Sequence, residues 1–537
     1  MEKGEIDRGV QSVTRPELPV PNLETSNGDF DQIPTRQIRD ARQKLGRMES
    51  LGRVCSLSDG YSCFHEGHQV MPREMGDSGE IGPPEDDERQ FTVSFDEDDP
   101  MNPRNMHTLK RWVIVIIVSW GSLCVTCVSS IYTTAYGQLI AEFGVGKEVA
   151  TLGLSFFIWG LGIGPLFLGP LSEFYGRRNI YIVSFALFVI WLIPCARATN
   201  IQTMLISRFF NGVAGSAFLS VAGGTVGDLF DRHELAAPMM IYTASPFLGP
   251  ELGPLIGGFI NQFTSWRWTF YVPLIWSGTL LIFIIFFVPE TYHPLILRHK
   301  AEKLRKETGD ERWKAPSEKT TRSVRQTIIQ SCYRPLQLLV FEPMCLNLCI
   351  FSALLLGIIY LFFGAFNLVF TQVYGFSLGQ VGCSFLGIFV GMIIAILSDP
   401  FWRYNYGSLE QKHTTLDGKV DFQPEWRLAP AITGAFGVTA GLFIFAWTSY
   451  PNVHWIAPII GSAVFGAGTI LVFSGIFTFL VEAYPSYAAS ALAANSFARS
   501  MFGGIFPLFG IQMYKKLGNQ WATTLLAFLT LVMLPFP

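Results

Sequence analysis

Two ionisable side chains lie inside long apolar stretches, where a charged group is costly. Arg208 and the nearby amide Asn211 belong to the stretch 201–224, and Glu251 belongs to the stretch 236–260. Ionisable residues in such surroundings normally face a partner or a wet cavity, where they can exchange protons or contact a bound molecule. Glu251 is therefore a candidate proton carrier. Two simpler alternatives remain: Arg208 can extend to a nearby membrane surface, and Glu251 can merely hydrogen-bond at a helix contact.

Metal and enzyme chemistry are not indicated by the other reactive side chains. The pairs Cys124/Cys127 and Cys345/Cys349 lie in apolar stretches without a nearby His or carboxylate, so we expect no zinc site. No Ser, His and Asp occur at matched spacing, and no His lies well inside an apolar stretch. We therefore expect no catalytic residues, no metal and no bound cofactor.

The composition indicates a membrane protein. Hydrophobic residues make up 50% of the 537 residues and charged residues only 15%, well below the share in soluble domains. The formal net charge is −3, which gives no reason to expect a nucleic-acid partner. A lipid bilayer is the expected surrounding.

Apolar stretches of about 20 residues, the length that crosses a bilayer, recur from residue 112 onward. We expect an all-α membrane protein with twelve transmembrane helices in two six-helix halves. The predicted spans are 112–133, 149–171, 180–195, 201–224, 236–260, 268–288, 344–366, 381–397, 428–447, 456–480, 487–513 and 521–537.

Four regions follow from this pattern. We expect a disordered cytoplasmic tail at 1–111, because this region is polar and has no sustained period. The halves are 112–289 and 343–537, and a charged cytoplasmic loop at 290–342 joins them. Loop Lys and Arg are concentrated on one side of the predicted topology, above all between Arg298 and Arg334. Loops rich in Lys and Arg stay on the cytoplasmic side of a membrane, so both termini are expected in the cytoplasm.

The loop after the second predicted span carries the first family signature. It contains Gly169, Glu173, Gly176, Arg177 and Arg178 in the pattern G-x-x-x-(D/E)-x-x-G-(R/K)-(R/K). This pattern resembles the signature of the major facilitator superfamily. Glycines permit a tight turn, and paired Arg residues anchor the inner face.

The fifth predicted span carries a second signature. Gly249, Gly253, Pro254, Gly257 and Gly258 follow the pattern G-x-x-x-G-P-x-x-G-G, which resembles the antiporter signature of that superfamily. Glycines four residues apart let helices approach closely, and proline bends a helix. Such a helix suits an interface between moving halves. The fourth span, with Arg208 followed by small residues, is similar to a further family signature.

Further segments narrow the resemblance to fungal twelve-span drug:proton antiporters, which include exporters of polyamines, drugs and toxins. The resemblance covers the chain from Asp99 onward and rests on the segments 99–105, 266–268, 289–294, 424–428, 482–485 and 490–499. It implies the major facilitator fold, a monomer, a proton gradient as the energy source and a plasma-membrane location, with the vacuolar membrane as the alternative.

The resemblance also implies a cytoplasmic latch in the outward-open state. Glu173 would approach the start of the eleventh span near Ser486 and Tyr487, and Arg178 would pair with Asp228. A carboxylate at a helix N-terminus is stabilised by roughly 0.3–1 kcal/mol.

In this superfamily the first, fourth, seventh and tenth spans line the path. The residues proposed for proton coupling or the substrate cavity are Tyr132, Arg208, Asn211, Glu251, Asn367 and Arg499. Hydroxyl groups on these spans are further candidates: Ser122, Thr126, Ser129, Tyr360, Thr469 and Ser474. A bond from such a hydroxyl to its own helix is an equally good interpretation.

The leading hypothesis is a proton-coupled exporter of small organic molecules that works by alternating access. A nutrient uptake carrier of the same fold is the first alternative. A non-transporting sensor on the same scaffold is the second.

Overall fold

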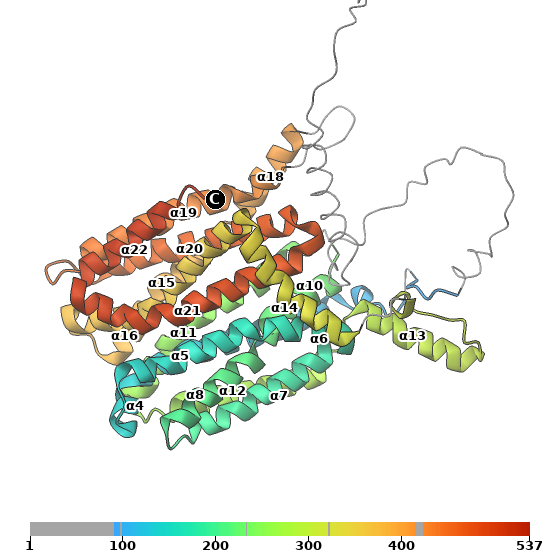
Figure 1. Cartoon of the computed structure of the whole chain (residues 1–537), viewed down its shortest axis with the longest axis horizontal. Helices are drawn as coiled ribbons and strands as arrows, with labels where there is room; N and C mark the ends of the chain where they lie inside the picture. Colours follow the sequence, from blue (N-terminus) through green and yellow to red (C-terminus); the bar gives the residue numbers. More distant parts are fainter. Residues whose placement is uncertain (1–90, 97–98, 232–233, 320–322, 414–422, 537) are drawn as a thin grey trace, which may run out of the picture. The chain divides into compact units, whose positions relative to one another are not determined.

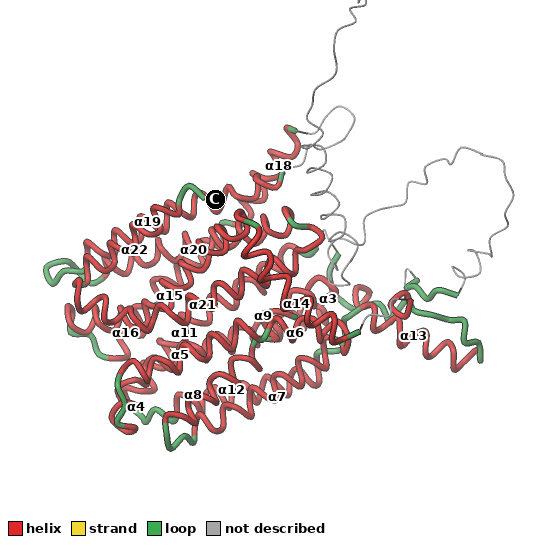
Figure 2. Tube along the Cα trace, in the orientation of Figure 1, coloured by secondary structure: helices red, strands yellow, loops and turns green. Residues whose placement is uncertain are grey.

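The computed structural model describes residues 91–96, 99–231, 234–319, 323–413 and 423–536, all of which belong to one compact unit. The predicted tail before residue 91 lies outside these ranges. The described residues form helices joined by turns and loops, with one isolated bridge between Thr92 and Lys314 (Figure 2).

A first set of helices precedes residue 290. It comprises α3 (Thr108–Ile131), α4 (Tyr136–Phe143), α5 (Lys147–Ile163), α6 (Pro165–Tyr175), α7 (Arg177–Ala196), α8 (Ile201–Gly215), α9 (Ala217–Ser220), α10 (Ala222–Leu229), α11 (Ala236–Phe263) and α12 (Trp268–Phe287). Within this set α3 packs on α11 and α12, and α8 packs on α5 and α7.

A second set follows residue 342. It comprises α15 (Pro343–Tyr374), α16 (Leu378–Ser384), α17 (Leu386–Leu397), α18 (Asp399–Lys412), α19 (Ala429–Thr448), α20 (Ile456–Ala483), α21 (Ala488–Leu517) and α22 (Asn519–Met533). Here α20 packs on α17 and α19, and α15 packs on α21. The two sets meet where α21 contacts α5 and where α11 contacts α16 and α17 (Figure 1).

Most of the predicted spans coincide with long apolar helices. Among the described residues, eight helical stretches are long and apolar enough to cross a bilayer, or nine if the bent pair α5 and α6 counts as one span. The other predicted spans coincide with α11, α21 and α22. The first two carry prolines and polar residues, and α22 has only 15 residues. The total of twelve stays a prediction.

Helix α12 shows why the bundle belongs in a bilayer. Ile275, Ile282 and Phe286 on this helix are 65%, 55% and 78% exposed. Water would disfavour such a row of apolar side chains, whereas lipid tails solvate them.

The segment 290–342, here called the central segment, is largely helical. It contains α13 (His293–Thr308) and α14 (Val324–Phe341). We call the end of the bundle from which α13 extends the central-segment end, and the end that carries α4 and α16 the far end (Figure 1).

Described residues in the segment predicted as a tail form contacts with the central segment. The amide of Val93 donates to the carbonyl of Lys314 at 3.1 Å, and α3 already begins at Thr108. Asp99 forms an ion pair with Lys300 on α13. Burial opposes ionisation of Asp99, but bonds from Lys300 and from the amide of Met101 lower its pKa. Amino-acid composition does not predict these contacts, because Asp99 and its partner Lys300 lie some 200 residues apart in sequence.

Glycines at a spacing of four hold α11 against α3. A side chain at Gly249 would overlap Thr126, and one at Gly253 would overlap Ser130. Gly257 similarly faces Thr134 on the short helix that follows α3. The absence of side chains therefore permits the close approach that the sequence pattern predicts.

We expect Gly249→Ala to destabilise the protein by about 1–3 kcal/mol, because the new methyl group would lie 2.7 Å from the carbonyl oxygen of Leu123. Thermal unfolding in detergent measures the effect. Gly278→Ala on α12 is the control, since its methyl group meets no atom within 4 Å. Equal melting temperatures for the two variants would contradict the close approach.

Candidate functional site: a central cavity and the polar cluster at its opening

A cavity of about 1480 Å³ lies between the two sets of helices. Its deep wall includes Thr126, Tyr242 and Phe247 from the first set and Tyr360, Phe473 and Arg499 from the second. Its outer wall includes Glu173, Arg177, Arg298, Arg403 and Arg427, which belong to the central-segment end. The cavity therefore opens at that end, and it is large enough for a small organic molecule.

Bonds between the two sets close the far end. The hydroxyl of Ser155 donates to the carbonyl of Gly504 at 2.6 Å. The amide of Gly379 donates to the Gln262 side chain at 2.8 Å, and Gln512 donates to Glu148 at 3.2 Å. Deeper in the bundle, the hydroxyls of Ser129 and Tyr360 lie 3.0 Å apart. These bonds must break if the far end is to open.

Helix α11 contacts both sets. Its Gly249, Gly253 and Gly257 face α3, whereas a side chain at Gly258 would lie 2.8 Å from the carbonyl oxygen of Leu378. The carbonyl of Pro254 packs against Gly382 on α16. The predicted antiporter motif thus faces α3 and the helix after it through three glycines, and the second set through Pro254 and Gly258.

At the opening, Gly176 reverses the chain between α6 and α7. Its φ of +89° is one that side-chain-bearing residues rarely adopt, and a side chain here would meet Glu290. By contrast, a methyl group at Gly169 would meet no atom within 4 Å. In this conformation, packing and the backbone angle therefore require a glycine at position 176 but not at position 169.

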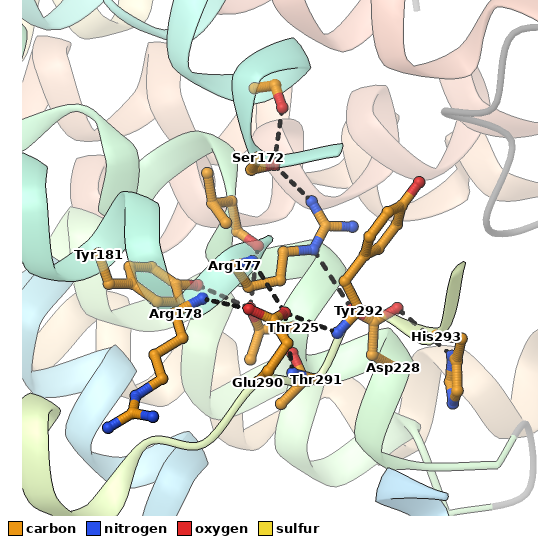
Figure 3. Close-up of polar contacts among 12 residues, drawn as sticks. Ser172, Arg177, Arg178, Tyr181, Thr225, Asp228, Glu290, Thr291, Tyr292 and His293 are labelled. Atoms are coloured by element: carbon orange, nitrogen blue, oxygen red, sulfur yellow. Dashed lines mark hydrogen bonds and ion pairs between the residues drawn. The ribbon is translucent and has the colours of Figure 1, made fainter. Parts of the chain in front are cut away.

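The Glu290 carboxylate caps the start of α7 (Figure 3). Oε1 accepts from the amides of Arg177 and Tyr292, each at 2.9 Å, and of Thr291 at 3.0 Å. Oε2 accepts from the amide of Arg178 at 3.2 Å. The first amides of a helix lack partners within it and carry partial positive charge. Glu290 therefore fastens the end of α12 to the start of α7.

Arg177 is the centre of the polar cluster in Figure 3. Its Nε donates to Asp228 on α10 at 3.3 Å, and a terminal nitrogen donates to the Ser172 hydroxyl at 2.8 Å. Its guanidinium carbon lies 4.9 Å from the ring centroid of Tyr292. Arg177 thus joins α6, α7, α10 and the start of the central segment.

The predicted latch concerns another conformation, and it stays a prediction. In this conformation Asp228 pairs with Arg177 rather than with Arg178, whose guanidinium donates to the carbonyl of Ile285 at 3.1 Å. The geometry at Gly176 explains the difference, because Arg177 is directed inward and Arg178 outward. Glu173 lines the cavity opening.

His293 lies beside this cluster, with Nδ1 3.9 Å from Asp228 Oδ1. Burial, and secondarily the guanidinium groups of Arg104 and Arg177, lower the pKa of His293 to about 4. His293 is therefore neutral at physiological pH, and Arg177 is the cation that balances Asp228.

Arg208 points into the first set of helices in this conformation. Its side chain is fully buried and donates to the carbonyls of Val128 and Ser129, each at 2.9 Å, and of Gly153 at 3.1 Å. The rings of Tyr132 and Phe157 flank it. Arg208 joins α8 to α3 and α5, away from the cavity wall.

Three other predicted cavity residues also lie off the wall in this conformation. Tyr132 is buried and donates to the carbonyl of Ala150 at 2.9 Å, and Asn211 donates to the carbonyl of Phe188 at 2.7 Å. Asn367 accepts from the hydroxyl of Thr371. Only Arg499, of the six predicted for coupling or the cavity, lines the cavity.

Glu251 is 1% exposed, and neither carboxyl oxygen has a hydrogen-bond partner among the described residues. In this conformation Glu251 therefore does not make the hydrogen bond at a helix contact that was the simpler alternative. Spacing along α11 puts Glu251 on one face with Phe247, Pro254 and Gly258. That face contacts the second set, because the Phe247 ring stacks on Phe473 and Pro254 packs on α16.

Several candidate hydroxyls bond within their own helices. Thr126 donates to the carbonyl of Ser122 at 3.0 Å, and Thr469 donates to that of Phe465 at 2.8 Å. Thr126, Tyr360 and Ser474 nevertheless line the cavity.

The comparison with family models gives one match over most of the chain. Residues 118–507 match the model of the Major Facilitator Superfamily. The chain belongs to this superfamily.

Two relatives within the Major Facilitator Superfamily are similar over most of their length. The chain is 56% identical to Efflux pump atB of Aspergillus terreus, covering 84% of this chain and 87% of that protein. It is 45% identical to the Probable drug/proton antiporter YHK8 of Saccharomyces cerevisiae, covering 84% and 88%.

Solved structures of the superfamily share the fold. The proton:xylose symporter XylE, 15% identical, aligns with a TM-score of 0.55 over 80% of this chain and 96% of that one. The human organic anion transporter MFSD10, 16% identical, aligns with a TM-score of 0.56 over 79% and 99%.

Sequence reasoning did not assign a role to Glu290, although the segment 289–294 helped to narrow the resemblance. The signal was an acidic residue directly after Pro289, at the end of an apolar span. Its partner, the start of α7, is more than 100 residues away, so no local pattern could identify the cap.

We expect Glu290→Gln to destabilise this superfamily member by about 1–3 kcal/mol, because an amide supplies one acceptor oxygen where the carboxylate supplies two. Thermal unfolding in detergent measures the loss. Glu307→Gln, on the exposed surface of α13, is the control. If both variants melt at the same temperature as the unmodified protein, the cap does not stabilise the fold.

Proposed function

We propose that this superfamily member is a proton-coupled exporter of small organic molecules that works by alternating access. The observation that carries the proposal is a large cavity open at the central-segment end and closed at the far end by bonds between the two sets. Relatives that are named efflux pumps and drug/proton antiporters favour export over uptake.

The two sets act as two six-helix halves, with twelve spans in all. Small residues at their contact, such as Gly258 and Gly382, allow the halves to rock without large side chains interlocking. A single chain encloses the cavity, so the working unit is a monomer. The plasma membrane is the proposed location.

The central-segment end faces the cytoplasm, together with both termini. Lys and Arg of the loops support this orientation, since they are concentrated in the central segment and beside Gly176. In this orientation the described conformation is ready to take up substrate from the cytoplasm.

We expect a single cysteine at Ser317, in a background without other cysteines, to be protected from a membrane-impermeant thiol reagent added to intact cells. Ser317 belongs to the central segment. A cysteine at Asn452, an exposed far-end position between α19 and α20, is the matched control and should react. Reaction of the cysteine at Ser317, together with protection of the cysteine at Asn452, would show that the topology is the reverse of the proposed one.

Glu251 is the proposed proton carrier. A carboxylate in a dry site without a hydrogen bond is costly, so the closed far end favours a protonated Glu251. Opening of the far end separates the face of α11 that carries Glu251 from the second half. Water could then reach the carboxyl group, and the proton could enter from outside and leave inward in the next half-cycle.

We expect Glu251→Gln to abolish acceleration of transport by an imposed pH gradient while leaving substrate exchange at equal pH, because glutamine cannot release a proton. Proteoliposomes with a defined gradient provide the measurement, with Glu302→Gln on α13 as control. Retained acceleration would remove Glu251 from the coupling step. Gradient-driven movement of substrate together with protons would instead support the uptake alternative.

A further inference from the structure

The deep wall of the cavity contains a guanidinium group held among three aromatic rings. The guanidinium carbon of Arg499, on α21, lies 4.8 Å from the ring centroid of Phe477, 5.4 Å from that of Phe473 and 5.5 Å from that of Phe247. All four residues line the cavity. Phe247 belongs to α11 and the other two rings to α20, so both sets of helices build this aromatic cage.

The charge of Arg499 has no balancing carboxylate. Arg177 pairs with Asp228, Arg403 with Asp399 and Arg427 with Glu482. No described Asp or Glu lies within ion-pair distance of Arg499, and its Nε is buried without a hydrogen-bond partner. Cation–π contacts offset only part of the cost of removing a guanidinium from water. The deep cavity therefore carries an uncompensated positive charge.

The rings beside this charge form a stacked apolar cluster on the cavity wall. Phe247 and Phe473 stack with centroids 4.8 Å apart, and Phe473 and Phe477 are parallel within 3°. Ser496 and Ser500, on the same helix as Arg499, also line the cavity and can supply hydroxyl groups. Arginine matches a carboxylate by forming two parallel hydrogen bonds. A planar aromatic ring that packs against the phenylalanines would place its carboxylate beside the guanidinium of Arg499.

We propose that the cavity selects organic anions, specifically planar aromatic carboxylates, with the carboxylate bound by Arg499 and the ring bound by Phe247, Phe473 and Phe477. This substrate class deepens the proposed export function and rests on it. The guanidinium selects for negative charge. The phenylalanine rings accept planar ring systems of different size and shape.

The first test measures binding to the purified unmodified protein at equal pH, without any gradient. The probes are 1-naphthoate, its neutral methyl ester and 1-naphthylmethylammonium, which share one ring system. We expect the carboxylate to bind about tenfold or more tightly than the ammonium, as expected for a charge-assisted contact. Equal or tighter binding of the ammonium would overturn the assignment.

The second test uses variants of Arg499. Arg499→Gln should weaken naphthoate binding about tenfold or more and leave binding of the methyl ester within about twofold, whereas Arg499→Lys should restore part of the affinity. Arg312→Gln, an exposed change in the central segment, is the control. Unchanged naphthoate binding in Arg499→Gln would contradict the proposal. The comparison of probes on the unmodified protein decides the question if that variant does not fold.

Transport in proteoliposomes separates this inference from the proposed function. Selective binding of naphthoate without gradient-driven export would support the anion site and contradict the exporter. Gradient-driven export of a neutral or cationic compound, without selective naphthoate binding, would support the exporter and overturn the anion site.

Discussion

A buried guanidinium must find its hydrogen bonds inside the protein, and Arg208 meets this requirement by joining three helices. Its donors bind carbonyls of α3 and α5, while the residue itself belongs to α8. Hydrogen bonds to charged groups contribute about 1.5–3 kcal/mol each, and an unpaired buried charge costs more than one such bond contributes. The three helices therefore cannot separate without exposing a charge to an apolar interior. Arg208 therefore stabilises the packing of α8 against α3 and α5.

The contact between the two sets of helices is of a different kind. At the far end it consists of a few hydrogen bonds, such as Ser155 to Gly504, and of small residues on α11 and α16. At the central-segment end the two sets are parted by the cavity. Contacts of this kind can break and re-form at modest cost, in contrast to the bonds around Arg208. The same relative position of the two sets thus closes the far end and opens the cavity at the other end. This relation is the physical basis of alternating access.

Sequence patterns predicted the features that depend on local composition. Apolar stretches located most helices, and glycine spacing predicted the close approach of α11 to α3. Hydropathy does not report the direction of a side chain, so Arg208 could not be assigned to backbone carbonyls, nor Arg499 to an aromatic cage. Contacts distant in sequence were also missed. Val93 contacts Lys314 and Asp99 contacts α13, and the cap at Glu290 depends on α7.

Paired spin labels can show whether the two ends of the bundle open in alternation. One pair is placed at Tyr175 and Tyr404, exposed positions near the central-segment end of the two sets, and a second pair at Ala141 and Asn452, exposed positions at the far end. Distances are measured by electron–electron resonance while the pH is lowered to drive the transition. Alternating access predicts that the first distance shortens as the second lengthens. Two distances that stay constant, or that change in the same direction, would contradict it.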